Sequence, residues 1–361
     1  TQDTLSSPSF TMLTLSNIKI GTSRLQPQMK DYVRRECPEW FTSLGLTLTE
    51  INGKISMDTI DLFKGYHILV TTAVDKVTAE VVTILAEHGL IGIFASGAAP
   101  SHIAVDRCKE LDVWVGAVGA YSPESIAGLA LAQLLRMLHS LDTIEDRMTR
   151  GDFSLLPTPP GTLIEKSVGI IGYGAIGQAF HRMCSSFKCK VAALDWQAAD
   201  THVPTHPHFH KETSDPAQVP RVSLPAMLAT SDVVFISCLE SDRTRGLLSR
   251  EMLSLCKPGC VLVNVARGSI IDTDALIDRL DTGALRCVLD VYDGEVGLFF
   301  RDHQGMEGVA QRDARFARLY SHKGCMVTPH CSWWTEPALS NIGSGTYQRI
   351  RDILIAKGLM E

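Results

Sequence analysis

The sequence predicts an α/β protein of two domains, each built on a parallel β-sheet that is covered by helices. The chain has 361 residues, which is more than one hydrophobic core usually organises. Short runs of β-branched residues alternate with amphipathic helical stretches, a pattern typical of parallel sheets with helices on their faces. A segment rich in proline and glycine at 155–162 separates two such series.

The composition is that of a soluble globular protein, with 45% hydrophobic and 20% charged residues. The formal net charge of −6 supplies no basic surface for a phosphate backbone, so we expect no nucleic acid partner. No apolar run reaches the roughly 18 residues of a membrane-spanning helix, so we expect no membrane contact. The ten cysteines form no CxxC pair and residues 1–12 do not resemble a secretory signal, which together favour the cytoplasm.

The first series predicts four strands, at 17–21, 66–71, 90–95 and 113–118. Residues 75–89 carry apolar side chains at helical spacing and end at Gly89, so they predict a helix between two of these strands. The third strand runs into the turn FASGAAP. There the backbone N–H groups of Gly97, Ala98 and Ala99 either receive an anion or simply make a tight corner.

A long helix is expected where the two series join. Apolar side chains recur at helical spacing over residues 121–148. Ser122 followed by Pro123 is a typical helix start, because proline suits the first helical turn.

The clearest motif is VGIIGYGAIGQAF at 168–180, a strand followed by Gly-x-Gly-x-x-Gly and the start of a helix. Gly172 permits the turn, Gly174 lets the backbone approach a pyrophosphate, and Gly177 allows the helix to pack closely on the strand. The next strand, KVAALD, ends at Asp195, whose carboxylate can bond to ribose hydroxyls. This succession predicts a dinucleotide-binding Rossmann domain, the alternative being a purely structural glycine turn.

The acidic residue after that strand indicates which dinucleotide is bound. Asp195 would repel the 2′-phosphate of NADP, and the adjacent Trp196 brings no compensating positive charge. NAD is therefore the predicted cofactor. Its phosphates would lie on the glycine loop, which also contains Tyr173, Ala175 and Ile176.

Further strands are predicted at 232–237, 260–266 and 286–291. Arg267 follows the second of these strands, and Asp290 and Glu295 lie at and beyond the end of the third. His330 follows another strand-like run, MVT. Each of these residues alone is commonly a surface charge or an ordinary hydrogen-bonding group. Because the carboxyl ends of parallel strands line one crevice, their joint occurrence beside a nucleotide site predicts a catalytic set.

Four segments together resemble one family. They are GIIGYGAIG at 169–177, VNVARGSIID at 263–272, LDVYDGE at 289–295 and TPHCSWWT at 328–335. In this order, over about residues 66–350, the chain resembles the D-isomer-specific 2-hydroxyacid dehydrogenases. The LFF run, the long connection before His330 and the segment AYSPESIA look most like the D-lactate dehydrogenase branch.

The resemblance implies that Arg267, Glu295 and His330 are the catalytic residues of an NAD-dependent enzyme that reversibly reduces a small or medium 2-oxo acid to the D-2-hydroxy acid. A guanidinium suits Arg267 for holding the substrate carboxylate and polarising its carbonyl. His330 as imidazolium would supply the proton in reduction and accept it in oxidation. Glu295 would favour the charged imidazole and fix its orientation. The related formate dehydrogenases have Gln in place of this Glu, so formate is disfavoured.

The resemblance also implies which residues contact the cofactor and the substrate. Asp290 would bind the nicotinamide carboxamide, the alternative being that it only ends a strand. Cys238 and Ala266 are further expected cofactor contacts. The expected substrate contacts besides Arg267 are Gly97, Ala98, Ala99, Tyr121 and Trp333. Trp333 either walls the substrate pocket or fills the seam between domains.

The family architecture implies a nucleotide domain at 122–328, inserted into a smaller, flavodoxin-like substrate domain formed by 1–121 and 329–361. The substrate would lie in the cleft between them, and domain closure would exclude water. A homodimer formed through the nucleotide domains is expected.

The chain departs from the family pattern at several positions: Ser96 in place of an arginine, Ala99 in place of a glycine, Ala175 in place of a basic residue, Gly128-Leu129 in place of Glu-His, and Leu239-Glu240-Ser241 in place of Pro-Leu-Thr. These departures weigh against pyruvate as the substrate more than against dehydrogenase chemistry. Two alternatives stay open: a biosynthetic reductase for a larger carbonyl or imine substrate, and an NAD-sensing scaffold of the transcriptional corepressor kind.

Two other features invite a functional interpretation. Residues 201–212 hold four histidines, but the surrounding prolines favour a loop over a metal site, and we predict no bound metal. Cys184 and Cys189 are expected to belong to the core rather than to form a redox pair.

Overall fold

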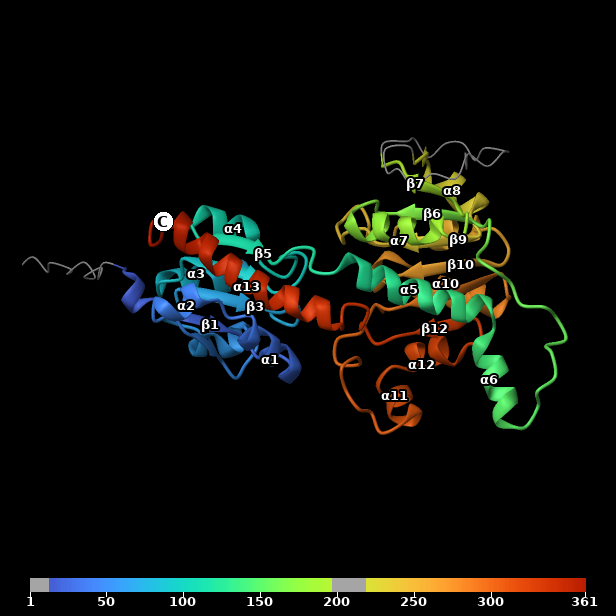
Figure 1. The fold of residues 1–361 in the computed structure, drawn as a ribbon, viewed down its shortest axis with the longest axis horizontal. Coiled ribbons are helices and arrows are strands. Elements are labelled where there is room, and N and C mark those ends of the chain that lie inside the picture. The colour runs from blue at the N-terminus through green and yellow to red at the C-terminus, as the bar shows by residue number, and fades with distance from the viewer. Residues whose placement is uncertain (1–12, 197–218) are drawn as a thin grey trace, which may run out of the picture. The chain divides into compact units, whose positions relative to one another are not determined.

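The computed structural model describes residues 13–196 and 219–361 (Figure 1). The chain forms two compact units, Thr1–Tyr121 with Glu336–Glu361, and Ser122–Thr335. Each contains one parallel sheet, which confirms the predicted α/β class with two such sheets. The histidine-rich stretch at 201–212 lies outside the described residues.

The sheet of the first unit has the order β2-β1-β3-β4-β5, with every neighbouring pair parallel. Its strands are β1 (Ile20–Thr22), β2 (Leu48–Glu50), β3 (Ile68–Thr71), β4 (Gly92–Ala95) and β5 (Trp114–Ala117). Four of the strands lie within or overlap the predicted runs. The edge strand β2 was not predicted, because its three residues are largely exposed and show no apolar run.

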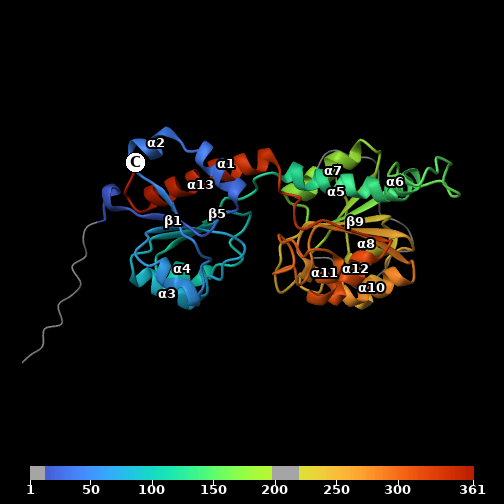
Figure 2. The same ribbon diagram turned by 90° about the horizontal axis from the view of Figure 1, so that it is seen from below.

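Helices cover both faces of this sheet. They are α1 (Pro27–Arg35), α2 (Glu39–Ser43), α3 (Ala79–Glu87), α4 (Val105–Glu110) and α13 (Glu336–Ala356). Figure 2 shows α3 and α4 on one face and α1 and α13 on the other. The helix predicted from residue 75 begins at Ala79, because the Thr78 hydroxyl caps it by accepting a bond from Val81 N at 3.3 Å.

The sheet of the second unit has seven parallel strands in the order β12-β11-β10-β9-β6-β7-β8. They are β6 (Ser167–Ile171), β7 (Lys190–Leu194), β8 (Arg221–Val222), β9 (Val233–Ile236), β10 (Cys260–Asn264), β11 (Leu285–Leu289) and β12 (Cys325–Val327). This is the doubly wound Rossmann order, in which ligands bind at the carboxyl ends of the strands near the switch between β6 and β9.

The helices of the second unit are α5 (Pro123–Leu138), α6 (Leu141–Thr149), α7 (Ala175–Ser185), α8 (Leu224–Thr230), α9 (Arg250–Ser254), α10 (Thr273–Asp281), α11 (Met306–Arg312) and α12 (Ala314–Ser321). The single long helix predicted over 121–148 is wrong. The first helix ends at Leu138, and Ser140, whose φ of 56° is left-handed, precedes the second helix α6.

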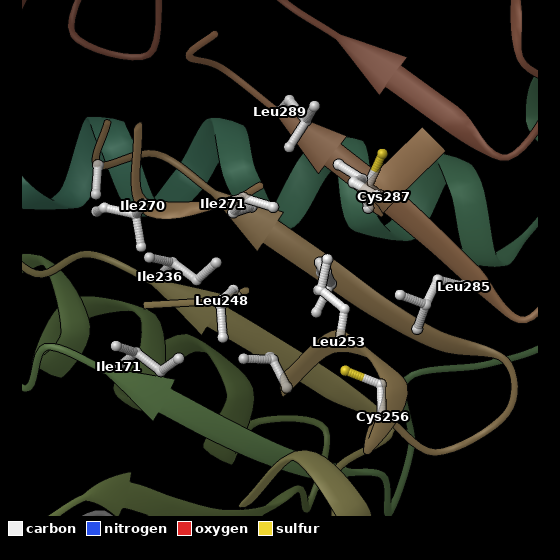
Figure 3. Close-up of a cluster of buried hydrophobic side chains, with 14 of the residues drawn as sticks. Ile171, Ile236, Leu248, Leu253, Cys256, Ile270, Ile271, Leu285, Cys287 and Leu289 are labelled. Carbon is white, nitrogen blue, oxygen red and sulfur yellow. The ribbon is translucent and has the colours of Figure 1, made fainter. Parts of the chain in front are cut away.

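Both faces of the seven-stranded sheet are buried. Figure 3 shows one of the two cores, in which Ile171 and Ile236 from neighbouring strands lie beside Leu248 and Ile270. On the other face, the rings of Phe180 and Phe235 stack with centroids 3.9 Å apart. Burial on two sides explains why these strands appear in the sequence as continuous apolar runs rather than alternating ones.

The boundary between the units differs from the predicted one. Residues up to Thr335 belong to the second unit, whereas the sequence places the change after residue 328. The reason is local bonding, since the backbone N–H groups of Cys331 and Ser332 donate to the carboxylate of Asp290.

Candidate active site

The glycine loop has the geometry that a dinucleotide requires. Gly172 has a φ of 97°, which side chains rarely adopt, and a Cβ on it would lie 2.4 Å from Cys238 N. A Cβ on Gly177 would lie 2.3 Å from the carbonyl oxygen of Gly172. Gly174 precedes α7 without a side-chain cap, and a Cβ there would meet nothing within 4 Å. The uncapped helix start is therefore open to a phosphate group, and the residues present fit the cofactor.

The other predicted residues of this loop lie on or beside α7. Ala175 and Ile176 are its first residues, and Ile176 packs against the core below. The Tyr173 hydroxyl lies 2.5 Å from His181 Nδ1, which directs the ring along the helix. Cys238 follows β9, and burial raises the pKa of its thiol to about 11, so its contribution here is close packing rather than nucleophilic chemistry.

Asp195 lies directly after β7, where its N–H donates to Val222 O at 2.8 Å. A positive charge that the sequence analysis did not foresee lies next to this position. The guanidinium of Arg243 lies over the indole ring of Trp196, with its carbon 5.2 Å from the ring centre. Arg243 comes from the segment after β9, so the sequence alone gave no sign of this contact.

Arg267 follows β10 in a loop that is fixed by a residue the sequence analysis did not single out. The side chain of Asn264, which is 1% exposed, accepts from Ala266 N and donates to Arg267 O, both at 2.9 Å. Arg267 in turn donates from Nη1 to Ala266 O at 2.7 Å. The only signal in the sequence was a polar residue at the end of a buried apolar run.

Gly268 brings the Arg267 loop against the loop that carries Glu295. A Cβ on Gly268 would lie 2.0 Å from Asp293 N and 2.1 Å from the carbonyl carbon of Tyr292. Only glycine permits this approach, so the two loops pack backbone to backbone.

Glu295 and His330 form the central pair of the site. His330 Nδ1 lies 2.8 Å from Glu295 Oε1, and each side chain is 22% exposed. The other carboxylate oxygen of Glu295 accepts from Tyr292 N at 3.2 Å. The carboxylate is thus oriented from its own loop, and it orients the imidazole in turn.

His330 has a left-handed backbone with a φ of 53°, a strained conformation for a residue with a side chain. Asp290, 2% exposed, holds the loop on both sides of it. Its Oδ1 accepts from Thr328 Oγ1 at 2.6 Å and from Cys331 N at 3.0 Å, and its Oδ2 accepts from Ser332 N at 3.0 Å. We call these three bonds the Asp290 clasp. They give Asp290 a role at His330 that the sequence analysis did not foresee.

Trp333 also supports this loop. Its indole Nε1 donates to the carbonyl of His330 at 2.9 Å, and its ring meets that of Trp334 edge-on at 5.0 Å. Trp333 therefore fixes the backbone of the histidine, whatever its part in the substrate pocket.

The remaining predicted substrate residues belong to the first unit. Gly97, Ala98 and Ala99 form the turn after β4, and Gly97 O accepts from Gly119 N at 3.3 Å. Ser96 is buried at the start of this turn, and Tyr121 O accepts from Asn341 Nδ2 at 2.6 Å. Their part in substrate binding stays a prediction.

Two further features, metal binding and the pair Cys184 and Cys189, concern residues 13–196 and 219–361. In that part of the chain no three His, Cys, Asp or Glu side chains gather in a way that would hold a metal. Cys184 and Cys189 are both buried, and their mutual hydrogen bond together with burial raises the pKa of the Cys184 thiol. A place in the core accounts for this pair. No helix among the described residues is long and apolar enough to cross a membrane.

Comparison with known proteins decides the family. Residues 131–332, more than half of the chain, match the profile of the NAD binding domain of D-isomer specific 2-hydroxyacid dehydrogenases. The chain belongs to this family. It therefore carries the family's NAD-binding domain, which confirms NAD as the predicted cofactor.

Individual relatives of this 2-hydroxyacid dehydrogenase support the same assignment. 2-Hydroxyacid dehydrogenase A of Aspergillus oryzae is 31% identical over 304 residues, 84% of this chain and 83% of that protein. D-lactate dehydrogenase of Lactobacillus delbrueckii subsp. bulgaricus is 30% identical over 289 residues, 80% of this chain and 82% of that protein. A structure described as the pyruvate reductase of Chlamydomonas reinhardtii has a TM-score of 0.76 at 31% identity, covering 95% of this chain and 98% of that one. These similarities support the predicted D-lactate dehydrogenase branch.

Proposed function

We propose that this 2-hydroxyacid dehydrogenase catalyses the reversible, NAD-dependent reduction of a 2-oxo acid to the D-2-hydroxy acid, with His330 as acid and base. The observation that carries the proposal is the 2.8 Å hydrogen bond between Glu295 and His330. The loop of Glu295 packs directly on the loop of Arg267. A proton donor, its charge partner and an anion-binding guanidinium thus come from adjacent loops of one unit.

Arg267 binds and orients the substrate. A guanidinium presents parallel N–H donors that match a carboxylate, and it can polarise a neighbouring carbonyl group. The bond from Arg267 Nη1 to Ala266 O and the two bonds of the Asn264 side chain fix this group before substrate arrives. Such preorganisation lowers the entropic cost of reaching a reactive geometry.

His330 moves the proton. Bound NADH supplies a hydride to the carbonyl carbon, and a proton must reach the carbonyl oxygen as negative charge develops there. Because Nδ1 of His330 is directed to Glu295, the proton leaves from Nε2. In the direction of oxidation, Nε2 of the neutral imidazole takes the proton from the hydroxyl group. Glu295 stabilises the imidazolium throughout.

The substrate is, in our proposal, a small or medium 2-oxo acid, and one departure from the family pattern weighs against pyruvate. The position at which D-lactate dehydrogenases usually have an arginine is Ser96, which is buried beside the turn of Gly97, Ala98 and Ala99. Backbone N–H groups of this turn would receive the carboxylate, as the resemblance implies. Asp290 would bind the nicotinamide carboxamide in addition to forming its clasp.

The test is NADH consumption with a panel of 2-oxo acids graded by side-chain size, followed by chiral analysis of the product. We expect one acid to be reduced rapidly to its D-hydroxy form. If NADH binds but no acid oxidises it, the proposal fails. That outcome would favour the NAD-sensing scaffold or a reductase for a larger carbonyl or imine substrate.

We also propose that the chain is a homodimer in the cytoplasm. Large apolar side chains are exposed on the second unit at Leu141, Met148, Phe153 and Leu155, and association would bury them. All ten cysteines are free thiols, which suits a reducing compartment. Sedimentation analysis tests the first statement, since a purely monomeric protein at micromolar concentration would contradict it.

A further inference from the structure

The β4 turn, as we call residues 96–102, offers three hydrogen-bond donors of its backbone. Within the described part of the chain, the N–H groups of Gly97, Ala98 and Ala99 donate to no protein acceptor. All three residues are half-buried or exposed, so a ligand can reach them. Successive N–H groups of this kind attract an anion, because each carries a partial positive charge.

One side chain of the β4 turn bonds to the neighbouring strand. His102 Nε2 lies 2.7 Å from the hydroxyl oxygen of Thr71, the last residue of β3. That hydroxyl donates its single hydrogen to Phe94 O at 3.1 Å. It therefore accepts from His102, which places a proton on Nε2. Because Thr71 is fully buried, water does not readily replace this bond.

Backbone bonds hold the β4 turn at both of its ends. At its start, the N–H of Ser96 donates to Thr71 O at 2.8 Å. At its end, His102 O accepts from Val77 N at 3.1 Å, and Ala104 N donates to Val77 O at 2.8 Å. The side chain of His102 links the two ends, because it bonds to the same threonine that receives Ser96. The three unbonded N–H groups lie within the loop that this link closes.

We propose that His102 is a positioning residue for the substrate: through Thr71 it holds the β4 turn in the conformation that receives the carboxylate of the 2-oxo acid. The inference rests on the proposed function, which assigns that carboxylate to this turn. Ser96 stands where D-lactate dehydrogenases usually have an arginine, so binding at the turn depends on the direction of its N–H groups. Hydrogen bonds weaken steeply when donor and acceptor are misaligned. A side chain that fixes the turn therefore controls how tightly the carboxylate binds.

The test measures binding of oxamate to the protein saturated with NADH. Oxamate has the carboxylate and the carbonyl of a 2-oxo acid but is not reduced, and quenching of NADH fluorescence reports its affinity. His102→Leu and Thr71→Val each remove one partner of the bond. We expect each to raise the Kd for oxamate by about three- to tenfold, the range for one hydrogen bond between uncharged groups. The Kd for NADH should stay the same, because the dinucleotide motif belongs to the second unit.

Three further variants separate positioning from a general effect on the fold. His102→Gln retains a side-chain donor for Thr71 and should restore most of the affinity for oxamate. The double variant His102→Leu/Thr71→Val should bind oxamate no more weakly than either single variant, since both changes remove the same bond. His88→Leu is the matched control, because it removes another histidine bond of the first unit, from Nδ1 to Ile84 O at 2.8 Å, and it should leave the Kd for oxamate unchanged. A thermal melt checks that each variant is folded.

Three results would overturn the inference. Unchanged oxamate binding in His102→Leu and Thr71→Val would show that the β4 turn keeps its conformation without their bond. Equal loss of affinity for oxamate and NADH would show a general loss of structure. A wild-type protein that binds NADH but no oxamate would remove the turn as an anion site. If oxamate binding depends on His102 but no 2-oxo acid oxidises NADH, the inference holds and the proposed reaction fails.

Discussion

Replacing Asp290 with asparagine separates the two roles that this residue has been given. In the structure its carboxylate accepts three hydrogen bonds from the loop on either side of His330 while being 2% exposed. Asparagine has the same shape, but one oxygen becomes an NH₂ group. If the amide oxygen keeps the bonds from Thr328 and Cys331, the NH₂ group faces Ser332 N, so one acceptor is lost and two donors oppose each other.

The size of the effect follows from these bonds. A hydrogen bond to a charged group contributes about 1.5–3 kcal/mol, and a buried donor without a partner costs a similar amount. We therefore expect Asp290→Asn to lower the free energy of unfolding by about 2 kcal/mol, which shifts the melting temperature by roughly 4–8 °C for a unit of this size. Because the clasp holds the strained backbone of His330, kcat should fall by at least about tenfold.

The assay combines steady-state NADH oxidation, NADH binding by fluorescence and a thermal melt. If the clasp is the main role of Asp290, kcat and the melting temperature fall while the Kd for NADH changes little. A large rise in the Kd for NADH with kcat and stability preserved would refute this reasoning. It would make Asp290 chiefly a contact of the nicotinamide carboxamide. Asp293→Asn, an exposed carboxylate on the following loop, is the matched control and should leave all three quantities unchanged.

Three further variants test the rest of the site by the same assays. His330→Ala should abolish turnover and leave the Kd for NADH near its wild-type value, and loss of NADH binding would contradict its role as proton donor. Glu295→Gln keeps a hydrogen-bond acceptor for the imidazole but removes the charge that stabilises the imidazolium. We therefore expect kcat for reduction to fall by at least about tenfold. An unchanged kcat would show that Glu295 has no part in the mechanism. Asn264→Ala removes the two hydrogen bonds that hold the backbone around Arg267. It should therefore raise KM for the 2-oxo acid more than KM for NADH. Equal changes in both KM values would indicate general loosening of the site.

The sequence was most informative in two places: where apolar side chains form a run or recur at a regular spacing, and where the backbone geometry requires glycine. Strands β6, β9 and β10 were predictable because both faces of the sheet are buried, which leaves uninterrupted apolar runs. Gly172 and Gly177 were predictable because a Cβ at either position would strike backbone atoms. By contrast, the two-residue strand β8 and the left-handed break at Ser140 have no local signature that a reader of one sequence could use.

The contacts that fix the loops of the candidate site could not be predicted from the sequence, for a different physical reason. The Asp290 clasp joins residues up to 42 positions apart, and two of its three bonds come from backbone N–H groups, which every residue except proline possesses. Side chains that bond to distant backbone leave no periodic pattern. Similarly, Arg243 and Trp196 are 47 positions apart, so their contact appears only when the ends of β7 and β9 are brought together. The burial of a polar side chain is the best sign of such a support, and burial is visible only in the structure.

The contacts of Asn264, Gly268 and Asp290 also bear on the proposed function, because the chain departs from its family pattern at a place away from them. Asn264 fixes Arg267, Gly268 joins the loops of Arg267 and Glu295, and Asp290 fixes His330, all within the second unit. The departure at Ser96 lies in the first unit and makes none of these bonds; its N–H donates to Thr71 O instead. Under the proposed function, a change there would alter which 2-oxo acid is accepted while Arg267 and His330 stay fixed. A shifted substrate range with an unaltered dependence on His330 is therefore the combination that this arrangement predicts.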